Sequence, residues 1–146
     1  MKRGSLWLLV LLFSVLLAGC GAEAPDYSHY SSPEKLDVTP VQTPMGTLYY
    51  QSRWDDWMVV TQEQEEEYLQ VDFSAKLEDT EYPLFHVTIG KGRGSLVGQI
   101  TDAEGTVRDV YIRSEEISRL EDLPEETQSK LYAMQEEINV LIEYLK

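Results

Sequence analysis

Residues 69–77 read Leu-Gln-Val-Asp-Phe-Ser-Ala-Lys-Leu, and this stretch decides the fold class of the chain. Its spacing places the apolar side chains on one face of an extended strand, namely Leu69, Val71, Phe73, Ala75 and Leu77. Successive side chains of a strand point to opposite faces of a sheet. A period of two therefore predicts one buried and one solvated face, which is typical of antiparallel sheets.

Strand composition also occurs in other segments, which polar or glycine-containing turns separate: 46–51, 58–62, 84–90, 95–101 and 106–113. No strand–helix–strand alternation occurs, so a parallel sheet is not expected. The pattern predicts an antiparallel meander of about six strands. The meander would form a curved sheet or a small open barrel, because the glycines between residues 90 and 98 allow sharp bending. Leu36, Val38 and Val41 alternate weakly and suggest an additional edge strand.

The C-terminal segment predicts helix. Ser114 is a good N-cap for a short turn that reaches Leu120, and Asp122 is expected to start the main helix in a capping box with Glu125. Apolar residues then recur at intervals of three and four: Leu131, Met134, Ile138, Leu141 and Leu145. Such a stripe is typical of a helix that packs on a core. We therefore expect an α+β fold with an amphipathic C-terminal helix packed on the sheet.

The beginning of the chain has the features of a secretory signal. A basic pair at residues 2–3 precedes an apolar run over residues 6–17, and small residues follow. These features make up a signal peptide. The cleavage region, Leu17-Ala18-Gly19-Cys20, resembles the lipobox of bacterial lipoproteins. The resemblance implies cleavage between Gly19 and Cys20 and attachment of a diacylglyceryl group, with acyl chains such as palmitate, to the Cys20 thiol.

This interpretation divides the chain into three parts. Residues 1–19 are the lipoprotein signal peptide, residues 20–44 are the lipidated cysteine with a tether rich in proline and serine, and residues 45–146 are the β-rich domain. Prolines favour extended chain over packed elements. The apolar run of the signal is shorter than the ~20 residues that span a bilayer. We therefore expect a protein held on the extracytoplasmic face of the membrane by its lipid.

Charge and cysteine content exclude several functions. The chain has a net charge of −14, which repels the phosphates of nucleic acids and excludes them as partners. Cys20 is the single cysteine, so it forms no disulfide within the chain, and lipidation leaves no thiol for catalysis. The sequence contains no HExxH motif, nucleophile elbow or Cys/His metal spacing. We accordingly expect neither a metal nor a cofactor.

One corner of the predicted sheet combines aromatic and acidic residues. Trp54, Asp55, Asp56 and Trp57 are consecutive. Indole rings stack on sugar rings while carboxylates accept hydrogen bonds from hydroxyls, so these four residues are the candidate ligand-binding site. The alternative is that the tryptophans belong to the core. His86 is expected to be a surface residue of a strand, facing outward with Thr88.

Two charged segments have structural and functional interpretations. Glutamates at 63, 65, 66 and 67 predict a solvated hairpin tip, with a hard cation such as calcium as the alternative ligand. Gly90-Lys91-Gly92-Arg93-Gly94-Ser95 predicts a glycine-rich hairpin turn. Its alternative role is an anion cradle built from amides and two basic side chains.

Taken together, these features predict a non-catalytic binding or accessory module of the bacterial cell envelope, anchored to the membrane through Cys20. An envelope protein or a wall glycan is the expected partner. Two alternatives are a structural or assembly subunit of an envelope complex, and a carboxylate-based wall-glycan hydrolase. The hydrolase would need two carboxylates about 5–10 Å apart in a cleft.

Overall fold

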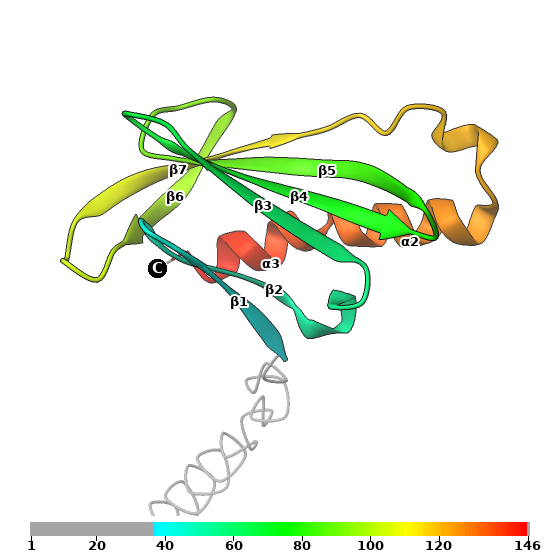
Figure 1. Ribbon diagram of the computed structural model, residues 1–146, viewed down its shortest axis with the longest axis horizontal. Helices are drawn as coiled ribbons and strands as arrows, with labels where there is room; N and C mark the ends of the chain where they lie inside the picture. The colour runs from blue at the N-terminus through cyan, green and yellow to red at the C-terminus, as the bar shows by residue number, and fades with distance from the viewer. Residues whose placement is uncertain (1–36, 146) are drawn as a thin grey trace, which may run out of the picture. The chain divides into compact units, whose positions relative to one another are not determined.

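The computed structural model describes residues 37–145, which form two antiparallel sheets and a helical layer (Figure 1). A hairpin contains β1 (Val38–Thr43) and β2 (Gly46–Gln51). A five-stranded sheet has the order β3-β4-β5-β7-β6, with β3 (Met58–Gln64), β4 (Leu69–Leu77), β5 (Thr80–Ile89), β6 (Ser95–Thr101) and β7 (Val107–Ser114). This sheet is open, because β3 and β6 form its two edges. The predicted α+β class and antiparallel architecture are confirmed.

The strand that decides the fold class, β4, covers the residues that its alternation predicts. Its first four inward side chains are buried, with exposed fractions of 1% or less for Leu69, Val71, Phe73 and Ala75. The next strand, β5, begins at Thr80 rather than at Leu84. A bulge between Phe73 and Ser74 absorbs one extra residue of β5, so pairing continues to Leu77 and Thr80. The turn between these two strands is therefore shorter than predicted.

The first strand lies within the segment that the sequence assigns to the tether. Alternation at Val38 and Val41 does mark a strand, but β1 pairs with β2 and not with an edge of the five-stranded sheet. The described fold thus includes residues before Met45. The predicted signal peptide, the predicted lipobox with Gly19 and Cys20, and residues 20–36 of the predicted tether lie outside the described residues.

The strand order departs from a simple meander at β6. Strand β7 lies between β5 and β6, and Ile112 of β7 pairs with Val87 on one side and with Ser95 on the other. Because β7 is antiparallel to both neighbours, β5 and β6 run in the same direction. The segment from Gly90 to Gly94 therefore crosses over β7 and is not a hairpin turn. The prediction of a plain glycine hairpin is wrong here.

Glycine is required in this crossover because the loop runs against β7. A Cβ atom at Gly94 would lie 2.4 Å from the carbonyl oxygen of Ile112, and one at Gly92 would lie 2.6 Å from the ring of Tyr111. Gly94 also has a φ of 105°, in the left-handed region that favours glycine. The repeated glycines therefore allow one backbone to pass over another. They do not close a tight turn.

The charged side chains of the crossover bind the neighbouring hairpin tip. Lys91 forms an ion pair with Glu67, which lowers the pKa of the Glu67 carboxyl and raises that of the Lys91 ammonium. The guanidinium of Arg93 lies 5.9 Å from the ring centre of Tyr68. The two basic side chains of the predicted anion cradle thus have partners within the protein. Glu67, which pairs with Lys91, is one of the four glutamates of the predicted hairpin tip between β3 and β4.

The C-terminal segment contains a 3-10 turn (η3, Leu120–Asp122) and two α-helices, α2 (Glu125–Gln135) and α3 (Glu137–Glu143). Ser114 ends β7 and caps no helical turn, so the predicted start of the short turn is wrong; the turn lies at residues 118–119, directly before η3. The predicted cap at Asp122 is also wrong, because α2 begins after Pro124 and no side chain caps it. Proline at this position costs no helical hydrogen bond, since the first amides of a helix have no partner within it. No helix among residues 37–145 is long and apolar enough to cross a membrane.

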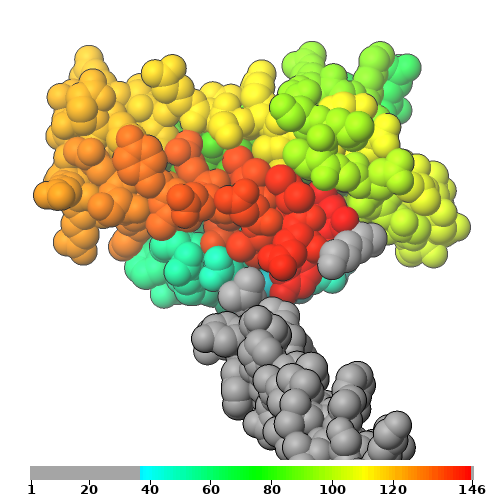
Figure 2. Space-filling view, turned by 180° about the vertical axis from the view of Figure 1, so that it is seen from behind, coloured from blue at the N-terminus to red at the C-terminus, as the bar shows by residue number. Residues whose placement is uncertain are grey.

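Both helices and the β1–β2 hairpin pack on one face of the five-stranded sheet (Figure 1). The helical stripe points into this core, where Leu131, Met134 and Leu141 are buried. Phe73 stacks on Phe85 with ring centres 4.7 Å apart. Viewed from behind, α2 and α3 run across the molecule between the hairpin and the strands (Figure 2). The prediction of an amphipathic helix on the sheet is confirmed, although Glu136 divides it into two segments.

Candidate ligand-binding groove

The four residues of the predicted site lie at the corner between β2 and β3, but they serve different purposes. A 3-10 turn, η2 (Ser52–Trp54), leads into it. Trp54 is buried, and its indole nitrogen donates a hydrogen bond of 2.7 Å to Oε1 of Glu137. The ring of Trp54 also meets that of Trp57 at an interplanar angle of 67° and a centroid distance of 6.3 Å. Trp54 is therefore a core residue, which is the alternative interpretation of the sequence.

The two acidic residues of the corner, Asp55 and Asp56, also differ in their surroundings. The hydroxyl of Thr39 donates a 2.6 Å hydrogen bond to Oδ1 of Asp55, which ties β1 to the corner. Burial raises the pKa of Tyr50 to about 12, and the neighbouring Asp55 carboxylate adds to the effect. Asp56 is exposed. The four residues thus do not form one surface, and Trp57 is the member that lines a groove.

Trp57 contributes to a groove of about 350 Å³ between the β4–β5 turn and the beginning of α2. Leu77, Glu78, Thr80 and Tyr82 come from the strand side, and Leu123, Pro124, Glu126, Thr127 and Lys130 come from the helix side. The groove therefore combines two aromatic rings, aliphatic side chains, three hydroxyls, two carboxylates and one ammonium group. Polar groups of this kind can orient a bound ligand.

Two details distinguish the polar groups of the groove. The Nζ atom of Lys130 lies 4.2 Å from the ring centre of Trp57, in cation–π geometry. Glu78, in the turn after β4, has a φ of 53°, in the left-handed region. Non-glycine residues adopt this conformation at a cost. The groove therefore contains an ammonium group on an indole face and a carboxylate held on a strained turn.

A buried carboxylate holds the corner that carries Trp57. Glu137, at the start of α3, has an exposed fraction of 1%. It accepts hydrogen bonds from the backbone nitrogen of Gln51 (3.0 Å), from the Gln51 side chain (2.8 Å) and from Trp54. The guanidinium of Arg53 lies 3.8 Å from the same carboxylate. These contacts hold the corner that carries Trp57 against the helical layer.

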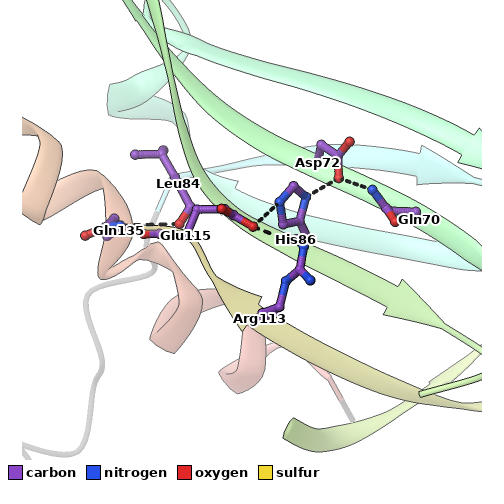
Figure 3. A network of polar contacts seen from close by, with 7 residues as sticks. All are labelled: Gln70, Asp72, Leu84, His86, Arg113, Glu115 and Gln135. Atoms are coloured by element: carbon purple, nitrogen blue, oxygen red, sulfur yellow. Dashed lines mark hydrogen bonds and ion pairs between the residues drawn. The ribbon is translucent and has the colours of Figure 1, made fainter. Parts of the chain in front are cut away.

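A second polar cluster lies on the opposite face of the five-stranded sheet (Figure 3). His86 of β5 contacts Oδ1 of Asp72 through Nδ1 and lies 2.7 Å from Oε1 of Glu115 through Nε2. Gln70 donates to Asp72 (2.9 Å), and Arg113 lies 3.1 Å from Glu115. His86 thus faces outward, as predicted, but it is part of a network and only partly exposed.

This network connects the sheet to the helical layer. The Gln135 side chain of α2 donates a 2.8 Å hydrogen bond to the backbone oxygen of Glu115. Both ring nitrogens of His86 face carboxylates. Within residues 37–145 no group of three or more His, Cys, Asp or Glu residues is arranged to hold a metal ion. Through these two contacts the His86 ring links β4 to the segment after β7.

Most residues of the groove carry no signal in the sequence. Tyr82, Glu78 and Lys130 lie far from Trp57 in the chain. The alternation that predicts the strands gives no information on the register between β4 and β5 or on the placement of α2. The sequence also gives no sign that Glu137 is buried, although this residue directly precedes Ile138 of the apolar stripe.

No protein-family model matches this chain, and neither the curated proteins nor the solved structures contain a match to it.

Proposed function

We propose that this protein is a lipid-anchored, non-catalytic binding module of the bacterial cell envelope. The lipobox at residues 17–20 supports the anchor, with Cys20 as the lipidated residue. Stable attachment by acyl chains needs more than one chain, and a diacylglyceryl group supplies two. The groove beside Trp57 is the proposed binding site, and it is the observation that supports a binding role.

A groove is a better candidate than a flat docking surface. Among residues 37–145 the large exposed apolar side chains are Leu96, Val107, Tyr132 and Tyr144, which lie on different elements. Leu96 and Val107 lie on the neighbouring strands β6 and β7, but the hydrogen-bonded pair of Gln99 and Asp109 lies between them. Scattered apolar residues are normal on soluble surfaces, whereas a contiguous patch marks a protein interface. We therefore favour a small envelope component as the ligand.

The apolar stripe of α2 and α3 favours the same choice. A structural or assembly subunit would dock through an exposed stripe on these helices. Leu131, Met134 and Leu141 instead point into the core. The helical layer therefore stabilises the groove and does not present an apolar face of its own.

The anchor is tested by metabolic labelling of the full chain in a bacterial host with an alkyne analogue of palmitate. We expect the wild-type chain and Trp57→Ala to be labelled equally and to fractionate with membranes, because the groove takes no part in lipidation. Cys20→Ser should lose the label and the cleavage. Equal labelling of Cys20→Ser, or an unlabelled wild-type chain, would contradict the anchor.

A further inference from the structure

We propose that the groove binds a ligand with a primary ammonium group on an aliphatic stem, which replaces the Lys130 side chain on the face of Trp57. This inference rests on the proposed function and identifies the chemical class of the ligand. Three observations support it: the position of the Lys130 ammonium, the carboxylates of the groove and the conformation of Glu78. Each leads to a separate measurement.

The first observation is that Trp57 already accepts an ammonium group. The Lys130 Nζ atom lies 4.2 Å from the ring centre, while Trp54 meets Trp57 in an edge contact. Ammonium groups bind an indole face through the quadrupole of the ring. Lys130 belongs to α2 and is only partly buried, and its four-carbon stem has many rotamers. It therefore acts as an internal competitor that a ligand can displace.

The second observation is the charge of the surroundings. Glu78 and Glu126 line the groove together with Lys130, so displacement of Lys130 leaves two acidic residues in the lining of the groove. The whole chain carries a net charge of −14. An anionic ligand would approach against this field, whereas a cation is attracted to it. Charge complementarity thus selects a cationic ligand over an anionic one.

The third observation concerns Glu78. Its φ of 53° lies where glycine is favoured, at the two-residue turn between β4 and β5. Glycine at this position would relieve the strain but would remove a carboxylate from the groove. The side chain of Glu78 thus lines the groove, although its backbone conformation makes the turn less stable than glycine would. We infer that Glu78 is the counter-charge for the ligand ammonium.

The experiment measures binding to the chain from residue 20 to residue 146 with Cys20→Ser, by tryptophan fluorescence and by ¹H–¹⁵N NMR. The probes are pentane-1,5-diamine, N-acetyl-lysine amide and its uncharged analogue N-acetyl-norleucine amide. The first two distinguish a free amine from a peptide side chain as the source of the ammonium. The trisaccharide of N-acetylglucosamine serves as a neutral glycan.

We expect both amines to shift the resonances of Trp57 and Glu78, with norleucine amide at least tenfold weaker. Lys130→Met keeps the aliphatic stem but removes the competitor, so it should bind the amines about fivefold more tightly, as expected for a cation–π contact of ordinary strength. Trp57→Leu should abolish the shifts. Tyr132→Ala, on an exposed part of the same helix, is the matched control and should bind as the wild type does.

Glu78 gives an independent test. Glu78→Gln keeps the strained turn and removes the charge, so it should weaken amine binding at unchanged stability. Glu78→Gly should weaken binding equally and raise the urea midpoint of unfolding, because it relieves the turn. Equal amine binding by both variants and the wild type would overturn the role of Glu78.

The outcomes separate this inference from the proposed function. If norleucine amide or the trisaccharide shifts Trp57 while the amines do not, the groove is a binding site and the ammonium inference is wrong. If Lys130→Met binds the amines no more tightly than the wild type, displacement of Lys130 is wrong. An amine titration that leaves the groove resonances of the folded wild type unchanged also overturns the inference, while the labelling of Cys20 decides the anchor by itself.

Discussion

Glu137 shows how much one side chain contributes to this fold. A carboxylate is rarely buried unless donors surround it, because the charge loses its hydration. Here the Gln51 backbone and side chain and the Trp54 indole all donate to it. The carboxylate therefore joins the end of β2 and the adjacent corner to α3, which lies more than 80 residues further along the chain.

We predict that Glu137→Ala lowers the free energy of unfolding by about 3 kcal/mol or more, because the donors of Gln51 and Trp54 lose a charged acceptor in a dry site. Glu137→Gln keeps one acceptor oxygen and should lose less. The exposed neighbour Glu136→Ala is the matched control, with an expected change of about 0.5 kcal/mol or less. Urea unfolding measures all three. A loss for Glu137→Ala no larger than that for Glu136→Ala would refute the role of the buried carboxylate.

At the scale of elements, the crossover from β5 to β6 determines the strand order. Its path over β7 places Gly94 against the Ile112 carbonyl oxygen, where no side chain fits. Gly105, in the β6–β7 hairpin, also has a positive φ of 85°, but a Cβ there meets nothing within 4 Å. Both glycines thus have a positive φ, but only at Gly94 would a side chain also clash with neighbouring backbone.

We predict that Gly94→Ala destabilises the domain by about 3 kcal/mol, since it combines an unfavourable φ with a clash against backbone. Gly105→Ala should cost only about 1 kcal/mol, because it carries the conformational penalty alone. Chemical unfolding followed by far-ultraviolet circular dichroism gives both values. Equal losses would mean that the loop does not pass over β7 as described.

At the scale of the whole molecule, shifted pKa values make the stability of the fold depend on pH, on the acid side through Asp102 and on the alkaline side through Tyr50. The ion pair with Arg108 lowers the pKa of Asp102, and amide hydrogen bonds from Thr106 and Glu104 act in the same direction. Burial raises the pKa of Tyr50 to about 12. The folded state thus holds Asp102 in its charged form and Tyr50 in its neutral form more strongly than the unfolded chain does.

The direction of the pH dependence follows from these shifts. Asp102 contributes stability that is present above the ordinary aspartate pKa and is lost as the pH falls through its lowered value. Tyr50 contributes stability that is complete below pH 10 and is lost as the pH rises towards about 12. We expect Asp102→Asn to flatten the acid side of the stability–pH curve and Tyr50→Phe to flatten the alkaline side, as measured by urea unfolding from pH 2 to 12. Unchanged slopes in these variants would contradict the assignment.

Local patterns in the sequence determined the elements and the class of the fold. Alternation from Leu69 to Leu77 depends only on the geometry of an extended chain, and the stripe from Leu131 to Leu145 depends only on helical geometry. Both could be predicted because the residues that make them are neighbours in the chain. The lipobox before Cys20 is also local, and the anchor stays a prediction from those four residues.

Tertiary structure decided what the elements do together. The insertion of β7 between β5 and β6, the pairing of β1 with β2 and the burial of Glu137 depend on contacts between distant residues. The groove depends on the same kind of contact, because Trp57, Glu78 and Lys130 meet only after the sheet and α2 have packed. Periodicity shows which face of an element is buried, but it does not show which other element covers that face. For this reason Trp54 and Trp57, which look equivalent in the sequence, separate into a core residue and a residue of the groove.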